Sequence, residues 1–172
     1  MNKTDTTDFN PFDGPELSAV LPLTDAQKEI WVSTIIEDTA SLCYNESFTI
    51  HLKGELQPEL LIDSIRILIL RHDSLRSVIS PDGTNLHVYS EITIDIPVIE
   101  APEYNSKQWL EILKDTTGFV FDLVNGPLSR FCLFRHNSGE HTLLMITHHI
   151  ICDGWSLDID RVFFYTFFML VI

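Results

Sequence analysis

Three segments of the chain repeat apolar residues with the period of an α-helix: residues 22–38, 57–73 and 106–118. Thr24 and Ser106 are hydroxyl caps for the first and third segments, and Pro58 suits the first turn of the second. Gln27 completes a capping box with Thr24. The predicted apolar faces are Ala26, Ile30, Trp31, Ile35 and Ile36 in the first helix and Leu61, Ile65, Leu68 and Ile69 in the second.

Shorter segments between these helices have the pattern of β-strands: residues 47–56, 74–80, 86–92, 128–136 and 141–149. Gly54 ends the first strand. The turn signals "PDGTN" and "NSGE" join the others into two hairpins. A chain that alternates helices and strand pairs in this way predicts a mixed α/β fold, with helices packed on a sheet.

Composition narrows the function classes. The 172 residues suffice for one domain with a core, and the net charge of −14 disfavours binding to a nucleic-acid backbone. No apolar run approaches the roughly 20 residues of a membrane span. The chain has three widely spaced cysteines, Cys43, Cys132 and Cys152. Their spacing does not match a metal-binding motif, and an odd number without a disulfide framework suits a reducing compartment. Residues 1–17 lack the pattern of a signal peptide and predict a mobile lead-in, so we expect a cytoplasmic protein.

Candidate chemistry lies in the stretch "MITHHIICDGWSLDI". His148 and His149 stand at the end of a buried strand, where neighbouring side chains face opposite sides. A neutral imidazole can accept a proton or hold a reacting group in line. Asp153 can orient that ring or pair with an arginine, and Asp153 with Gly154 predicts a turn into a helix over 155–159. A structural role for both histidines stays open at this point, and a metal site is disfavoured.

Further segments in the same order resemble the condensation domains of non-ribosomal peptide synthetases. "HHIICDGWS" matches their His-His-x-x-x-Asp-Gly motif, and "LTDAQKEIWV" is similar to their first motif, with Asp25 in place of a serine. "RHDSLRSVI" and "FDLVNGPLSRFCL" resemble two further motifs of the family. The resemblance covers roughly residues 21–159.

The resemblance implies the N-terminal half of a chloramphenicol-acetyltransferase-like fold, an α/β arrangement with a mixed sheet and packed helices. It implies peptide-bond formation between a thioester donor and an amine acceptor. Each is carried on the phosphopantetheine arm of a peptidyl or aminoacyl carrier protein, so no cofactor is bound directly. Adenylation domains or the rest of a synthetase are further implied partners.

The same resemblance assigns roles to residues. His149 becomes the catalytic histidine, and His148 supports the loop. Gly154 gives the turn its freedom and brings a backbone amide toward the oxyanion. Asp153 becomes a structural residue that pairs with Arg71 or, as the less favoured choice, with Arg76.

The chain also departs from the family. A complete domain is more than twice as long, and the apolar segment 161–172 does not match the amphipathic helix expected there. We therefore expect a truncated domain over 18–160, with an atypical tail, inactive alone. Three hypotheses stay open: an amide-forming half, a non-catalytic remnant or carrier-protein-binding module, and, less favoured, a coenzyme A-dependent acyltransferase.

Overall fold

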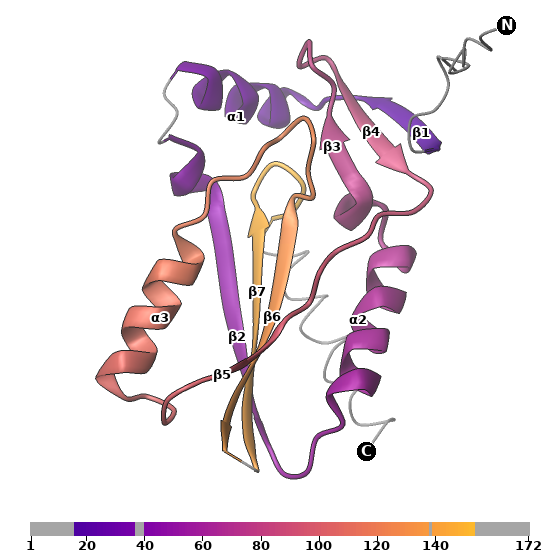
Figure 1. The fold of residues 1–172 in the computed structure, drawn as a ribbon. Coiled ribbons are helices and arrows are strands. Elements are labelled where there is room, and N and C mark those ends of the chain that lie inside the picture. The colour runs from indigo at the N-terminus through magenta and orange to yellow at the C-terminus, as the bar shows by residue number, and fades with distance from the viewer. Residues whose placement is uncertain (1–15, 37–39, 138, 154–172) are drawn as a thin grey trace, which may run out of the picture.

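Two β-sheets and three α-helices make up the described part of the chain, which in this computed structural model is residues 16–36, 40–137 and 139–153 (Figure 1). The helices are α1 (Asp25–Ile36), α2 (Pro58–Arg71) and α3 (Lys107–Thr117). The strands are β1 (Leu17–Pro22), β2 (Asn45–Lys53), β3 (Ser77–Ile79), β4 (Asn85–Tyr89), β5 (Val98–Glu100), β6 (Ser129–Asn137) and β7 (Glu140–His148). Short 3₁₀ turns cover Ala40–Tyr44 and Asp73–Arg76.

The larger sheet positions the candidate site. Its strand order is β2-β7-β6-β5, so β7 is a central strand with antiparallel neighbours on both sides. The short strand β5 runs parallel to β6, which makes the sheet mixed as predicted. From His141 to His148 every residue of β7 is buried, and this continuous burial explains why the strand reads as an almost unbroken apolar run. The His-His pair therefore lies at the end of a buried strand that is paired with a neighbour on each edge.

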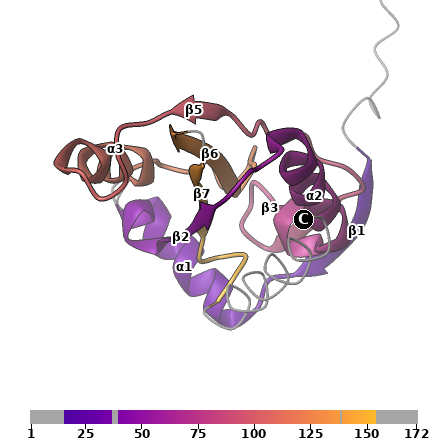
Figure 2. The ribbon, with the colours of Figure 1, turned by 90° about the horizontal axis from the view of Figure 1, so that it is seen from below.

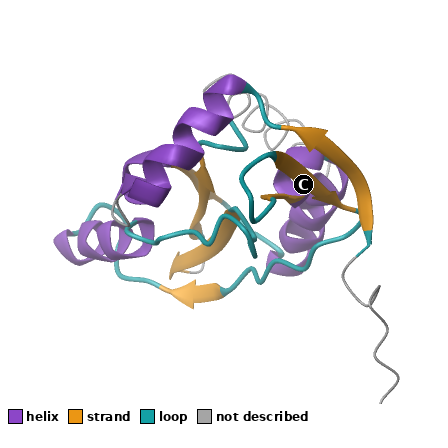
Figure 3. Cartoon of the chain, turned by 90° about the horizontal axis from the view of Figure 1, so that it is seen from above, coloured by secondary structure: helices purple, strands orange, loops and turns teal. Residues whose placement is uncertain are grey.

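The two faces of this sheet carry separate cores. On one face, α2 packs its four predicted apolar residues against side chains of β2, β6 and β7. On the other face, Trp109 of α3 joins Phe134, Leu144 and Ile146. Seen from below and from above, α2 and α3 lie on opposite sides of the sheet (Figures 2 and 3). The fold is thus helix, sheet, helix, as expected for amphipathic helices that cover a sheet.

Local sequence signals set the helix starts. The Thr24 backbone N–H donates to the Gln27 carbonyl oxygen Oε1 (3.0 Å), and the Gln27 N–H donates to Thr24 Oγ1 (3.2 Å), so the predicted capping box is confirmed. Ser106 Oγ accepts from the Trp109 N–H (3.1 Å), which confirms the second cap.

The structure differs from the sequence prediction in the number of sheets. The hairpin β3–β4 does not join the larger sheet; it forms a second sheet of order β1-β4-β3. Neither β1 nor β5 was predicted. β5 is a three-residue strand, too short for a periodic signal, and β1 is exposed along most of its length, so it lacks the alternation of a half-buried strand.

The apolar face predicted for α1 is not buried in the described part of the chain. Ile35 and Ile36 of that face are 63% and 79% exposed, and no residue of the helix is fully buried. Only Ile30 and Trp31 pack partly against the core. The reason is positional, because α1 lies across the end of the sheet near the β3–β4 turn instead of over a face (Figure 1).

The β3–β4 turn depends on Gly83. Its φ is +68°, a region that favours glycine, and an added Cβ would lie 1.9 Å from Nε1 of Trp31. The indole of Trp31 thus covers the glycine directly and fixes α1 against the turn.

We expect Gly83→Ala to lower the free energy of unfolding by about 1–3 kcal/mol, because the new methyl group meets both a disfavoured φ and the indole ring. Urea unfolding of the two proteins measures this difference. Gly54→Ala is the matched control, since Gly54 also has a positive φ of 114° but no atom near the added Cβ. An equal loss in both variants would show that Trp31 contributes nothing.

Three predictions fall on residues outside the described part. They are the helix after Gly154, the atypical tail and most of the mobile lead-in predicted for residues 1–17, of which the structure describes only the end, where Leu17 begins β1. Within the described residues, no helix is long and apolar enough to cross a membrane.

Candidate active site

His148 is the last residue of β7, and its side chain is fully buried. Its Nδ1 accepts from the Ile150 backbone N–H (3.2 Å), so the ring proton belongs on Nε2, which faces the Ser41 hydroxyl (3.3 Å). The rings of Tyr44 and Phe121 lie about it, with centroids 6.0 and 6.1 Å away. Both nitrogens therefore have partners inside the protein, which makes His148 a structural residue of the loop.

Burial determines the protonation state of His148. Loss of solvation, and then the neighbouring His149, lower the pKa of His148 to about 4. The ring is neutral at physiological pH. A neutral imidazole is also what the bond to the Ile150 N–H requires, because a protonated ring has no acceptor.

His149 faces the other way. Its backbone N–H donates to the Tyr44 carbonyl (2.7 Å), which holds the residue beside β2. The side chain is 38% exposed, whereas His148 is fully buried, so the predicted alternation of the pair is confirmed. Of the two rings, only that of His149 is accessible from outside the protein.

The ring of His149 is exposed unevenly. Its Nδ1 is buried and has no hydrogen-bond partner. The exposed surface of the side chain therefore belongs to its other atoms. Among the described residues, Oε1 of Glu46 is the carboxylate oxygen beside this ring, 3.8 Å from Nδ1. Glu46 lies on the neighbouring strand β2, opposite Thr147, and its side chain is 48% exposed. A small rotation of this half-exposed side chain would bring it within hydrogen-bond distance.

The loop after β7 is tied to both neighbouring segments. Gln27, the capping residue of α1, donates from Nε2 to the Ile150 carbonyl (2.9 Å). The Leu128 carbonyl accepts from the His148 N–H (3.0 Å), and the Ile151 N–H donates to the His148 carbonyl (3.1 Å). The motifs at 23–32 and 121–133 thus meet at the His-His segment, and Gln27 binds this loop in addition to capping α1.

The two arginine residues that the resemblance offers as partners of Asp153 have different environments. Arg76 is buried; it forms an ion pair with Asp73 and donates to the backbone carbonyls of Ile69, Tyr89 and Ser90. These contacts tie the 3₁₀ turn to β4 and leave Arg76 as a structural residue that does not pair with Asp153. Arg71, at the end of α2, is exposed.

Asp153 is the last described residue and is also exposed, where we had expected a buried carboxylate. Its pairing with Arg71 stays a prediction. Gly154 and its backbone amide lie outside the described residues.

Two residues of the site were missed from the sequence, Ser41 and Glu46. Neither stands in a recognisable motif, and each reaches its histidine from about a hundred positions away through the pairing of β2 with β7. Within the described residues, no cluster of three or more His, Cys, Asp or Glu side chains is arranged to hold a metal ion.

Comparison with known proteins identifies the family. The family model of the Condensation domain matches residues 18–166. The chain therefore belongs to the condensation-domain family. It is 33% identical to the dimodular nonribosomal peptide synthase of Bacillus subtilis over 138 residues, 80% of this chain and 6% of that protein.

Solved structures agree on the fold. The starter condensation domain of the rhizomide synthetase RzmA, in a mutant form, matches 86% of this chain and 36% of that chain, with a TM-score of 0.74 and 22% identity. The X-domain in a complex with OxyB from teicoplanin biosynthesis matches 88% of this chain and 32% of that chain, with a TM-score of 0.76 and 24% identity. The chain spans about a third of these solved chains, and the predicted fold class is confirmed.

Proposed function

We propose that this chain forms one wall of a site that makes amide bonds in non-ribosomal peptide synthesis. The proposal rests on the different environments of the two adjacent histidines. His148 is buried, neutral and bonded at both nitrogens, while His149 presents a half-exposed ring at the end of the same strand. A rigid neighbour such as His148 helps hold a reactive ring in position, because functional groups work best when packing and hydrogen bonds around them fix their geometry.

In the proposed reaction, the amine nitrogen of the acceptor attacks the carbonyl carbon of the donor thioester. The new C–N bond forms, the C–S bond breaks, and the proton lost by the amine ends on the departing thiolate. His149 accepts or directs that proton, and a carboxylate at Nδ1 favours the tautomer whose Nε2 lone pair faces the amine. We assign this positioning role to Glu46, because its carboxylate is 3.8 Å from Nδ1.

The substrates arrive on partners. We propose that two carrier proteins present donor and acceptor on phosphopantetheine arms and that the other domains of a synthetase surround this one. Holding both reactants at one site supplies much of the rate, because effective concentrations replace a bimolecular encounter. Location in the cytoplasm is part of the proposal and rests on the three cysteines of the sequence, whose spacing fits no disulfide framework.

A chimera tests the function. Residues 1–159 are fused to the remaining two-thirds of a related condensation domain and mixed with two carrier proteins loaded with aminoacyl thioesters. We expect dipeptidyl thioester on the acceptor carrier, detected by mass spectrometry of the intact carrier. The same fusion partner without residues 1–159 is the control. A folded chimera that binds both carriers yet yields no product above that control would contradict the proposal.

A binding module is the second candidate. One of the matched structures is an X-domain in a complex with OxyB, so a domain of this fold is seen bound to another protein. A chimera that binds carriers without forming product would favour this reading.

A further inference from the structure

Among the described residues, one edge of β6 has no strand beside it over residues 129–132. Its partner on that side, β5, pairs only from Val98 opposite Leu133 to Glu100 opposite Arg135. The Leu133 N–H already points to this side, because it donates to the Pro97 carbonyl (2.9 Å). Backbone groups of alternate residues face the same edge, so the N–H and C=O groups of Phe131 and Ser129 point outward here as well.

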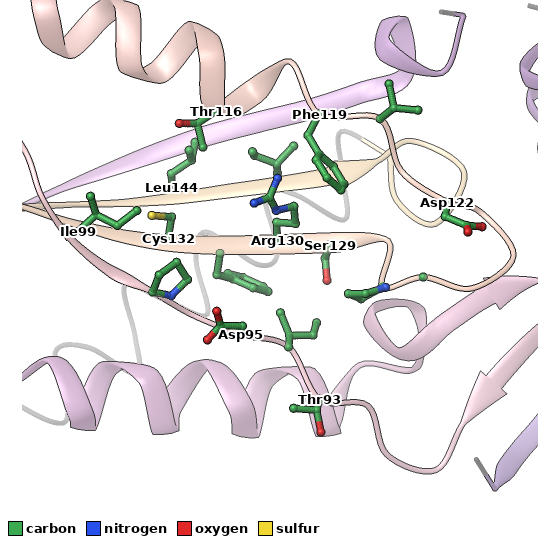
Figure 4. A pocket seen from close by; sticks show the side chains of 17 residues that line it. Thr93, Asp95, Ile99, Thr116, Phe119, Asp122, Ser129, Arg130, Cys132 and Leu144 are labelled. Carbon is green, nitrogen blue, oxygen red and sulfur yellow. The ribbon is translucent and has the colours of Figure 1, made fainter. Parts of the chain in front are cut away.

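A cavity of about 520 Å³ follows this open edge. One wall is the end of α3 and the segment after it, Thr116 to Val120; the other is the segment Thr93 to Pro97 (Figure 4). Arg130 and Cys132 point to the first wall, and Ser129 points to the second (Figure 4). A single cavity can take side chains from both faces of a strand only where that strand has no neighbour. We call this cavity the β6 groove.

Two polar groups of the β6 groove lack partners. Oγ of Ser129 is buried and has no hydrogen bond. The guanidinium carbon of Arg130 lies 4.1 Å from the ring centroid of Phe119, and Arg130 forms no ion pair among the described residues. The side chain of Arg130 is exposed, so its charge is open to a ligand. Asp122, which also lines the groove, forms no ion pair with it; its carboxylate accepts from the backbone of Val124 and Asn125.

Much of the remaining lining is apolar and includes Ile94, Phe131, Leu144 and Ile146. Burial raises the pKa of the Cys132 thiol to about 11, so this thiol stays protonated and acts as an apolar group without nucleophilic character.

We propose that the β6 groove binds an extended peptide segment of a partner protein, which adds a strand beside β6. The backbone of the segment pairs with Ser129 and Phe131, and an acidic side chain of the segment lies beside Arg130. This mode of recognition uses backbone hydrogen bonds for affinity and alternating side chains for specificity. The site is separate from His149 and goes beyond the proposed function.

The alternation of a strand defines the ligand further. Residues on either side of the acid face the wall that carries Ser129, Ile94 and Asp95, where apolar side chains are favoured and a second acid is repelled by Asp95. The open edge of β6 lies between two walls of the chain itself, an arrangement that favours a single extended segment over the edge of another folded sheet. A second copy of this chain is therefore not the occupant.

A palindromic peptide tests the proposal without assuming a strand direction. The probe is acetyl-Thr-Val-Glu-Val-Thr-amide, titrated into the ¹⁵N-labelled 172-residue chain. We expect amide shifts at Ser129 to Cys132 and at Thr93 to Ile96, with saturation in the millimolar range or below. The same peptide with Lys in place of Glu should bind about tenfold more weakly, because like charges meet across the strand pair.

Charge exchange supplies the decisive control. Arg130→Glu should weaken the Glu peptide and restore binding of the Lys peptide, a result that a mere packing effect would not give. A peptide N-methylated at Glu and at both Val residues should lose binding, because these N–H groups pair with β6 in a parallel or an antiparallel segment. The proposal is overturned by absent shifts at the groove, by equal binding of both peptides, or by octanoate producing the same shifts, which would indicate a site for small apolar acids. Shifts that depend on protein concentration without peptide would instead indicate self-association and would also overturn it.

Discussion

His149→Ala is expected to lower the rate of dipeptide formation in the chimera by about 10²–10⁴, the usual contribution of a positioned acid–base group. The ring of His149 is the accessible one of the pair, and its loss removes the group that takes or directs the proton of the attacking amine. Single-turnover assays on loaded carriers separate this effect from carrier binding. Unchanged circular dichroism and an unchanged unfolding midpoint are needed beside the rate, so that lost folding is not read as lost chemistry.

Glu46→Gln distinguishes positioning from chemistry in the same assay. It removes the charge beside Nδ1 but keeps the shape, so the rate should fall less than in His149→Ala, and ¹⁵N shifts of the His149 ring should show the Nε2–H tautomer gaining population. Glu46→Asp should restore part of both readouts.

Full activity in His149→Ala would refute the catalytic role and leave positioning of the two carrier arms as the source of rate.

The sequence predicted well wherever a local period or a turn signal was decisive. The face of α2, with Leu61, Ile65, Leu68 and Ile69, is buried as predicted, because four apolar residues at helical spacing have one common side. The two hairpins were found from their turns. The relation between His148 and His149 followed from the alternation of a strand.

The unpredicted features depend on contacts distant in sequence. β5 and β1 exist because β6 and β4 offer edges to them, and no local period records that. Ser41 and Glu46 reach the histidines only after β2 pairs with β7. The exposed face of α1 shows the opposite limit, since its apolar residues predict burial while the described chain leaves Ile36 79% exposed.

Acid is expected to destabilise the fold through His148. The pKa of His148 is about 4 in the folded chain against an ordinary value of 6.5. The unfolded chain therefore binds one more proton than the folded chain between these values, and stability falls as pH falls through this window. Above about pH 6.5 both states are neutral and the contribution is complete. A difference of this size corresponds to about 3 kcal/mol at the acid end.

Urea unfolding at intervals between about pH 7 and pH 4 measures this loss. His148→Asn should be less stable at neutral pH, because it vacates volume among Tyr44 and Phe121, but should lose markedly less stability on acidification. Burial also lowers the pKa values of His51 and His141, so a smaller acid loss should persist in that variant. His87→Asn, at a half-buried position in β4, is the matched control and should retain the full loss. If His148→Asn and the unmodified chain lose equal stability, the ring of His148 is not held neutral by burial, and its bond from the Ile150 N–H does not organise the loop that presents His149.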